Sequence, residues 1–251
     1  MVLPRESEGD LAGKPPHVAQ AFHSKGAEGP LSDVTDEQKR EVIAHTYGMI
    51  ALVDDQVGRL LNELDELGIS ENTIVIFCSD HGELLFDHGL LKKGPFLYEG
   101  LVRVPLLMRW PRRLDAGRRI EGLFSLSDLT PTLLSLIGVE GWPGIEGMDQ
   151  SNVLQGDDAI ERTAALIEYY GGRETFDDGQ RLRTLVTEQW KLIHYVGEPF
   201  GELYDLTADS EEFRNVYDDA RYAEVRIELE EQLTDVGVGS EAHFGRRLAP
   251  A

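Results

Sequence analysis

The chain has 251 residues, 41% of them hydrophobic, and its 46 acidic and 24 basic side chains give a formal net charge of −22. This length and composition are those of a folded protein with one large domain, or with one domain and a small addition. A surface of this charge repels nucleic acid and anionic membranes, so we expect neither as a partner. The dispersed acidic residues and the few lysines resemble proteins of salt-accumulating organisms, although an ordinary solvated acidic surface has the same composition.

The N-terminal sequence MVLPRESEGDLAGKPPH lacks the apolar core of a signal peptide, and no apolar run is long enough to span a membrane. We therefore expect a cytoplasmic protein. Cys78 is the one cysteine, so an intrachain disulfide is excluded. Its position inside an apolar run predicts a small, buried side chain.

The first part of the chain divides into an irregular segment and a long helix. Residues 1–33 are rich in Gly, Pro and charge without sustained periodicity, which predicts loop structure. Thr35 and Gln38 have the spacing of a capping box, and apolar residues at helical spacing follow. Gly68 is placed to end this helix.

The middle of the chain, residues 34–158, alternates helices with apolar runs. These runs predict strands at 73–79, about 103–109 and about 120–126. A second helix is expected to begin at Asp128, with Pro131 in its first turn and Gly138 at its end. This alternation predicts an α/β domain whose sheet is mostly parallel and is flanked by helices.

The last part, residues 159–251, has a different pattern. Short amphipathic runs separated by Gly and Pro predict a small antiparallel sheet. A helix over about 221–235, with Val225, Leu229 and Leu233 on one stripe, is expected to close this subdomain before a C-terminal tail.

Polar groups gather directly after the predicted strand 73–79. They are Asp80, His81 and Gly82, a second Asp-His-Gly from Asp87, and the pair Lys92 and Lys93 before a glycine. In open α/β sheets, ligands bind beyond the carboxyl ends of the strands. A carboxylate and an imidazole placed there can bind one divalent cation, with a nitrogen that suits Mn²⁺ or Zn²⁺, and a lysine can hold a tetrahedral oxyanion. The alternatives are a capped turn for Asp-His-Gly and a solvated loop for the lysines.

The stretch ENTIVIFCSDHGELLFDHGLLKKGPFLYEGLVRVPLLMRWP resembles the C-terminal metal-binding segment of the sulfatases, which belong to the alkaline-phosphatase-like superfamily. HTYGMIALVDDQVGRLLNELDELGI resembles the helix that precedes this segment. LSDLTPTLLSLIGV, RTLVTEQWKLIHY and GELYDLTADSEEFRNV resemble the later helix and the small sheet. The resemblance covers roughly residues 35–235. It implies that the chain has part of an alkaline-phosphatase-like fold and belongs to an enzyme that hydrolyses a sulfate ester.

The resemblance also implies roles for individual residues. Asp80 and His81 would be ligands of one divalent metal ion, with Ca²⁺ or Mn²⁺ expected. Lys93 would be catalytic and would bind the sulfate oxygens, with Lys92 as a bystander. His88 would contact substrate. Arg103 would buttress the site, whereas His17, His23, His45 and His194 receive no role.

The chain departs from the family pattern in its nucleophile. Sulfatases use a formylglycine made from the first residue of Cys-x-Pro-x-Arg or Ser-x-Pro-x-Arg, and this sequence contains neither motif, since Cys78 is followed by Ser-Asp-His. The aspartate pair of the first strand and a Lys-x-His element are also missing. We therefore expect the C-terminal half of a sulfatase, inactive by itself and with apolar faces and unpaired strand edges exposed.

Three hypotheses follow. The chain is a sulfatase portion acting on a sulfate ester of a small molecule or glycan, with a separate N-terminal half chain as its partner. It is a phosphate or phosphonate ester hydrolase of the same superfamily. Or it is a non-catalytic sulfatase remnant.

Overall fold

The computed structural model describes residues 3–4, 11, 13–23, 31–156, 162–171 and 180–241. These residues form two compact units, one ending at Ala116 and the other beginning at Gly117. The division therefore falls inside the segment 34–158, which the sequence pattern groups together. Among the described helices, none has the length and hydropathy needed to cross a membrane.

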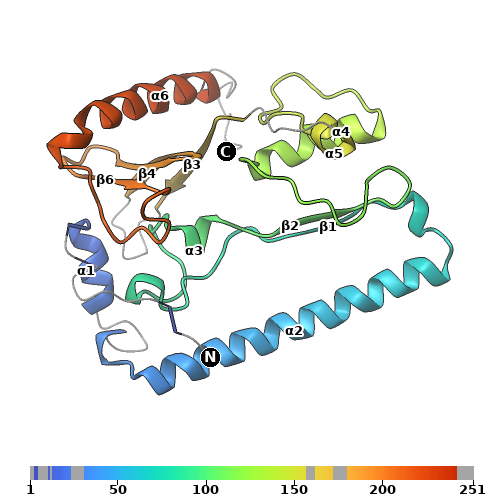
Figure 1. Cartoon of the computed structure of the whole chain (residues 1–251), viewed down its shortest axis with the longest axis horizontal. Helices are drawn as coiled ribbons and strands as arrows, with labels where there is room; N and C mark the ends of the chain where they lie inside the picture. The colour runs from blue at the N-terminus through green and yellow to red at the C-terminus, as the bar shows by residue number, and fades with distance from the viewer. Residues whose placement is uncertain are drawn as a thin grey trace, which may run out of the picture. The chain divides into compact units, whose positions relative to one another are not determined.

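The first unit contains three α-helices and a two-stranded sheet (Figure 1). Its elements are α1 (Pro16–His23), η1 (Leu31–Asp33), α2 (Asp36–Glu66), η2 (Ser70–Asn72), β1 (Val75–Cys78), η3 (Asp87–Gly89), α3 (Glu99–Val102) and β2 (Leu106–Arg109). The helix α1 corrects the prediction that residues 1–33 are irregular. Pro16 is its first residue, where a missing backbone N–H is tolerated and the fixed φ suits a helix.

The predicted boundaries of the long helix α2 are confirmed. Thr35 caps its start: the backbone amide of Gln38 donates a hydrogen bond of 3.3 Å to the Thr35 hydroxyl. In return, the Gln38 side-chain oxygen accepts a hydrogen bond of 2.9 Å from the backbone amide of Thr35. The helix ends at Glu66, and Gly68 follows with a φ of +68°. Both ends are therefore set by local chemistry that depends on only a few residues.

The strands β1 and β2 form where the apolar runs predict them, although both are shorter. They pair antiparallel, with Val75 opposite Arg109 and Cys78 opposite Leu106. The described strands therefore do not show the mostly parallel sheet that the sequence pattern predicts, because each of their pairs is antiparallel and an antiparallel pair needs no crossover connection. Cys78 is exposed, which corrects its predicted burial, because the last two residues of β1 have no covering layer in the described unit.

The second unit contains a helical segment and a four-stranded sheet. Its elements are η4 (Leu126–Asp128), α4 (Leu129–Ile137), α5 (Ser151–Gln155), β3 (Ala164–Tyr170), β4 (Arg181–Thr187), β5 (Trp190–Tyr195), β6 (Gly201–Asp205), η5 (Ala220–Tyr222) and α6 (Ala223–Glu241). The strand predicted at about 120–126 does not form. Ser125 and Asp128 make a capping box there, which turns the backbone into η4. Gly138 ends α4 with a φ of +71°, as predicted.

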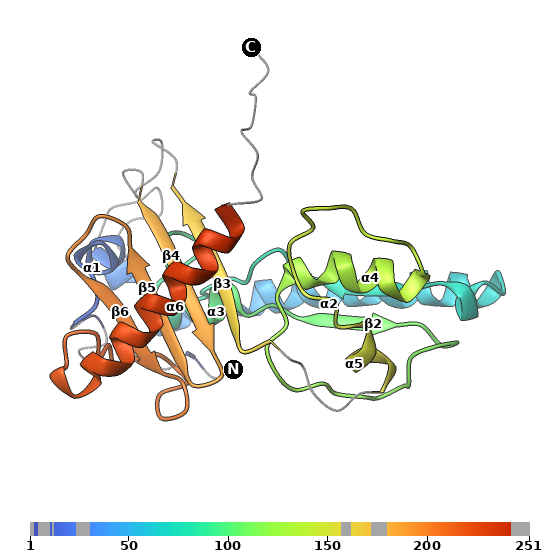
Figure 2. The same ribbon diagram turned by 90° about the horizontal axis from the view of Figure 1, so that it is seen from above.

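The four strands form the antiparallel sheet that the sequence predicts, in the order β3-β4-β5-β6. The helix α6 crosses one face of this sheet (Figure 2). Buried leucines of the sheet and helix form the core between them: Leu185, Leu192, Leu203, Leu229 and Leu233. The α/β class and the separate small antiparallel sheet are thus confirmed.

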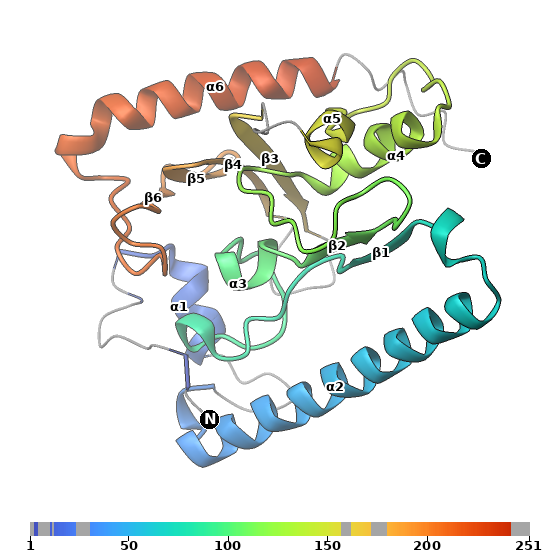
Figure 3. The same cartoon turned by 45° about the vertical axis from the view of Figure 1, so that its right-hand side comes forward.

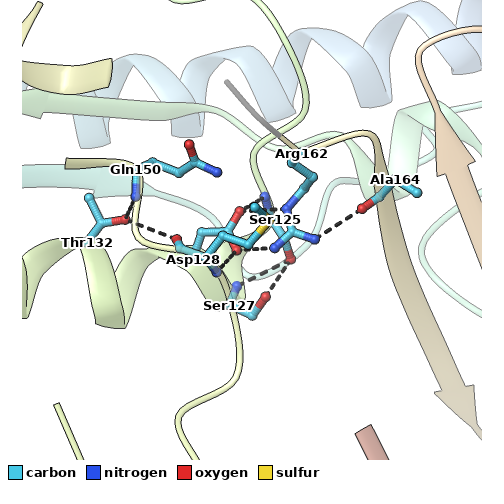
Figure 4. Close-up of polar contacts among 8 residues, drawn as sticks. Ser125, Ser127, Asp128, Thr132, Gln150, Arg162 and Ala164 are labelled. Atoms are coloured by element: carbon cyan, nitrogen blue, oxygen red, sulfur yellow. Dashed lines mark hydrogen bonds and ion pairs between the residues drawn. The ribbon is translucent and has the colours of Figure 1, made fainter. Parts of the chain in front are cut away.

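A buried ion pair links the end of η4 to the segment that directly precedes β3 (Figure 4). The Asp128 side chain is completely buried, and the Arg162 side chain is 13% exposed. Arg162 donates to both carboxylate oxygens of Asp128, one from Nε at 2.8 Å and one from a terminal guanidinium nitrogen. The same carboxylate accepts the backbone amides of Ser125 at 3.0 Å and Met148 at 2.7 Å. One side chain therefore holds three chain segments of the second unit.

Candidate metal and anion site

The loop between β1 and α3 folds back on itself through backbone hydrogen bonds. The Gly82 amide donates to the Leu101 carbonyl at 2.7 Å, and the Leu84 amide donates to the Lys92 carbonyl at 3.2 Å. A Cβ atom on Gly82 would lie 2.1 Å from the Gly100 carbonyl oxygen, so only glycine fits there. This close approach fixes the two residues that immediately precede Gly82.

The same loop concentrates unusual backbone conformations. Four of its non-glycine residues have positive φ values: Leu85 (45°), Phe86 (73°), His88 (51°) and Lys92 (67°). Each such residue costs of order 1 kcal/mol or more and persists only where surrounding packing over-determines the backbone. Buried neighbours supply that packing, since Leu84, Phe86 and Leu90 are each at most 2% exposed. Strain of this kind is typical of functional loops.

His81 is held in one orientation and one tautomer. Its Nδ1 lies 2.7 Å from the Gly82 carbonyl oxygen, and its Nε2 lies 3.0 Å from the Lys93 ammonium nitrogen. An ammonium group can only donate, so Nε2 accepts this bond and the ring proton resides on Nδ1. A backbone carbonyl that binds Nδ1–H in this way presents Nε2 as the nitrogen for a ligand.

Asp80 lies beside this nitrogen and is open to solvent. Its side chain is 86% exposed, and one carboxylate oxygen lies 3.8 Å from Nε2 of His81. The other oxygen accepts the His81 backbone amide at 3.0 Å. This backbone hydrogen bond lowers the pKa of Asp80. An ionised carboxylate and a neutral imidazole nitrogen can therefore face the same cation.

The donor set fits part of a divalent metal site. A carboxylate oxygen with an imidazole nitrogen suits Mn²⁺ or Zn²⁺, and Ca²⁺ less well because it prefers oxygen. Within the described ranges, no group of three or more His, Cys, Asp or Glu side chains could hold a metal ion. Asp80 and His81 thus offer two ligands of a larger coordination shell. Because Nε2 has a single lone pair, a metal ion there and the Lys93 ammonium would compete for it.

The two lysines of the loop differ in their surroundings. Both are exposed, and Lys93 contacts His81. Lys92 has a left-handed backbone, and its carbonyl accepts the Leu84 amide. Lys93 is therefore placed beside the candidate ligands, whereas the backbone of Lys92 closes the loop.

His88 lies under the loop rather than on its surface. It is 2% exposed, and its ring centroid lies 4.3 Å from that of Tyr98. The Lys14 ammonium lies 4.2 Å from the same Tyr98 ring, and the His17 ring stacks on Phe96 at 5.9 Å. Sequence reasoning gave Lys14 and His17 no role, and no local pattern connects them with residues about 80 positions later.

Two further charged residues that the sequence analysis names, Arg103 and His45, lie beside acidic side chains. Arg103 is exposed, and its guanidinium lies 3.6 Å from the Glu99 carboxylate. His45 is exposed on α2 beside Glu41. The sequence analysis did not identify Lys39 of α2, which is 7% exposed and packs against the strained loop. Its ammonium nitrogen lies 5.7 Å from the ring centroid of Phe86.

Comparison with known proteins identifies the family of this chain. The family model described as Sulfatase matches residues 14–139, and the model described as N-sulphoglucosamine sulphohydrolase, C-terminal, matches residues 86–238. An N-acetylglucosamine-6-O-sulfatase of Bacteroides thetaiotaomicron is 34% identical over 190 residues, which are 74% of this chain and 34% of the relative. The chain thus spans about a third of that relative.

Two solved structures share the fold. The phosphonate monoester hydrolase of Agrobacterium radiobacter superposes with a TM-score of 0.82 at 32% identity, over 95% of this chain and 50% of that chain. A structure in complex with its substrate D-glucosamine-2-N,6-O-disulfate superposes with a TM-score of 0.77 at 23% identity, over 99% of this chain and 62% of that one. With two family models that each match more than half of its residues, the chain belongs to the sulfatase family.

Proposed function

We propose that this chain carries the metal-binding and sulfate-binding part of an enzyme that hydrolyses a sulfate ester. The observation that supports this most directly is the contact between His81 and Lys93. A neutral imidazole nitrogen and an ammonium group lie 3.0 Å apart, with the Asp80 carboxylate beside them. A site that binds a cation next to an anion needs electron-pair donors for the cation and N–H donors for the anion at one place.

In this proposal each residue has a separate task. Asp80 and His81 hold one divalent ion, which, when bound, would polarise the reacting groups and offset charge on the sulfate. Lys93 donates its N–H groups to the non-bridging sulfate oxygens once it is released from His81. The formylglycine nucleophile is not encoded in these 251 residues, so it is supplied from outside this sequence. His88 stays a predicted substrate contact, which requires its buried ring to be uncovered.

The proposed substrate is a sulfate ester of a small molecule or glycan. The relative from Bacteroides thetaiotaomicron is named for a 6-O-sulfated amino sugar, and one similar structure holds a disulfated glucosamine. An alternative is hydrolysis of a phosphonate or phosphate ester. The specific support for it is the similarity, at 32% identity, to a phosphonate monoester hydrolase.

Calorimetric titration of the chain with Mn²⁺ and with Ca²⁺ tests the metal site. We expect wild-type protein to bind at least one of these ions at one site, and His81→Ala and Asp80→Asn to bind it at least tenfold more weakly. His45→Ala is the matched control, because His45 is an exposed histidine of the same unit. Equal affinity in all four proteins would exclude the proposed ligands.

The reaction is tested by co-expressing the chain with the polypeptide encoded directly upstream of it. Aryl sulfate, aryl phosphate and phenyl phosphonate monoesters are then supplied in turn at high salt. Faster turnover of the sulfate supports the proposal, and faster turnover of the phosphonate or phosphate supports the alternative. No turnover of any of the three, with the metal site intact, identifies a non-catalytic remnant.

A further inference from the structure

The loop that carries the candidate site pairs its two arms with each other. The Leu84 amide donates to the Lys92 carbonyl at 3.2 Å, and the Phe86 amide donates to the Leu90 carbonyl at 2.6 Å. Residues 84–92, here called the paired loop, therefore have a closed end at 86–90 and an open end at 84 and 92. The backbone bonds between the arms fix how far apart the two sides of the open end lie.

The contact between His81 and Lys93 is made at the open end of the paired loop. His81 comes three residues before the paired loop, and Lys93 follows it directly. One partner thus lies on each side of the loop, with 3.0 Å between the imidazole Nε2 and the ammonium nitrogen. This contact requires that the two arms remain paired, so whatever holds the paired loop also holds the site.

The closed end of the paired loop is held in a strained backbone conformation. Phe86 has a φ of +73° and His88 a φ of +51°. Such conformations persist only where the surrounding structure over-determines them. The Phe86 side chain is 1% exposed, so its ring is enclosed by neighbouring side chains. The groups that contact this ring therefore contribute to keeping the arms paired.

The long helix α2 presents a charged side chain to this ring. The loop between β1 and α3 reaches the first turns of α2 (Figure 3), where the Lys39 ammonium lies 5.7 Å from the ring centroid of Phe86. Lys39 and Ile43 are the buried residues of α2, and their spacing places them on the same side of the helix. A lysine that is 7% exposed needs a partner for its charge, and the face of an aromatic ring can be one.

The backbone of Lys39 is fixed by the cap of α2. Its amide donates to the Thr35 carbonyl at 2.9 Å, and the capping box of Thr35 and Gln38 holds the same turn. Two donors of the first turn thereby have partners, which makes this turn a firm point of attachment. The ammonium group therefore reaches the closed end of the paired loop from a fixed position.

We infer that Lys39 is a positioning residue: it holds the closed end of the paired loop through the Phe86 ring, so that His81 and Lys93 meet at the open end. Its charge matters because the attraction between an ammonium group and an aromatic face is directional, whereas an apolar side chain would only fill the space. The inference rests on the proposed function for what His81 and Lys93 bind. It does not rest on that function for the contact between them.

The test uses the full 251-residue chain with four substitutions. Lys39→Met removes the charge and keeps the length of the side chain, whereas Lys39→Arg keeps a cation that also binds aromatic faces. Phe86→Leu removes the ring. Arg40→Met is the matched control, because Arg40 is the next residue of α2 and its side chain is 49% exposed.

Two measurements are made on each protein. Amide hydrogen exchange of Leu84 and Phe86 reports the pairing of the arms without any metal. The Val216 amide, which donates to the Leu203 carbonyl at 2.9 Å in the second unit, is the internal reference. Calorimetric titration with Mn²⁺ then measures the candidate site.

Lys39→Met should speed exchange of Leu84 and Phe86 about three- to thirtyfold, as expected for the loss of one such contact, with Val216 unchanged. It should also weaken Mn²⁺ binding at least threefold. Lys39→Arg and Arg40→Met should stay within twofold of wild type in both measurements. In the Phe86→Leu background, Lys39→Met should have no further effect, because the partner ring is already absent.

Unchanged exchange and Mn²⁺ affinity in Lys39→Met would overturn the inference. So would equal losses in Lys39→Met and Lys39→Arg, or faster exchange of Val216, since these indicate a general role in packing. If the wild-type chain binds no Mn²⁺, the proposed function fails on that result. The exchange of Leu84 and Phe86 then still decides whether Lys39 holds the paired loop.

Discussion

Replacing Asp128 with alanine should destabilise the second unit more than any exposed substitution. The carboxylate is completely buried, pairs with a guanidinium that is 13% exposed, and accepts two backbone amides. Removing one partner of a buried ion pair costs about 3–5 kcal/mol, because the other charge is left without compensation. The backbone amides of Ser125 and Met148 also lose their acceptor, which places the expected loss toward the upper end of that range.

Urea unfolding followed by the fluorescence of Trp190 measures this effect. Trp190 packs against the core between the sheet and α6, so it reports on the unit that contains the ion pair. Glu140→Ala, an exposed acidic residue of the same unit, is the control and should change the free energy of unfolding by less than about 0.5 kcal/mol.

A double-mutant cycle separates the ion pair from the other roles of Asp128. If the two charges stabilise each other, Asp128→Ala with Arg162→Ala should cost less than the sum of the single changes, by about 1–3 kcal/mol. A loss below about 1 kcal/mol for Asp128→Ala, or strictly additive single changes, would refute the reasoning.

Three further outcomes are expected. Burial, with the Glu202 charge as a second cause, raises the pKa of Tyr204 well above its ordinary value. The resulting stability is present below the unfolded pKa of about 10 and is lost as pH rises above it, so Tyr204→Phe should flatten the fall of the urea midpoint at alkaline pH. Gly82→Ala should weaken Mn²⁺ binding at least tenfold in calorimetry without changing unfolding of the second unit, since its Cβ meets the Gly100 carbonyl. Lys93→Met should strengthen Mn²⁺ binding about two- to tenfold in the same titration, because a competing hydrogen bond to His81 is removed; unchanged binding would argue against that competition.

The elements predicted well from sequence are those whose causes are local. The capping box of Thr35 and Gln38 spans four residues, and Gly138 ends its helix through its own backbone conformation. The strand expected at about 120–126 failed for a related reason. The capping box of Ser125 and Asp128, which also spans four residues, turns the backbone at the end of its apolar run.

For the candidate site, the sequence predicts the residue types, whereas the contacts between them come from the tertiary structure. Asp80, His81 and Lys93 are marked in the sequence by their residue types and by their place after a strand. The hydrogen bond between His81 and Lys93 could not be predicted from the sequence, because it depends on a loop with several positive φ values. The burial of His88 under Tyr98 likewise depends on packing that no short pattern records.

The sequence alone therefore determined the ends of α2 and α4, the division into an α/β part and a small antiparallel sheet, and the residue types of the site, since these depend on neighbours along the chain. Only the tertiary structure decided the pairing direction of β1 and β2, the partner of Asp128 34 residues away, and the exposure of α2. These features depend on which distant segments meet, and on which faces no described segment covers. Hydrophobic periodicity indicates that a face is to be buried, but it does not specify what buries it.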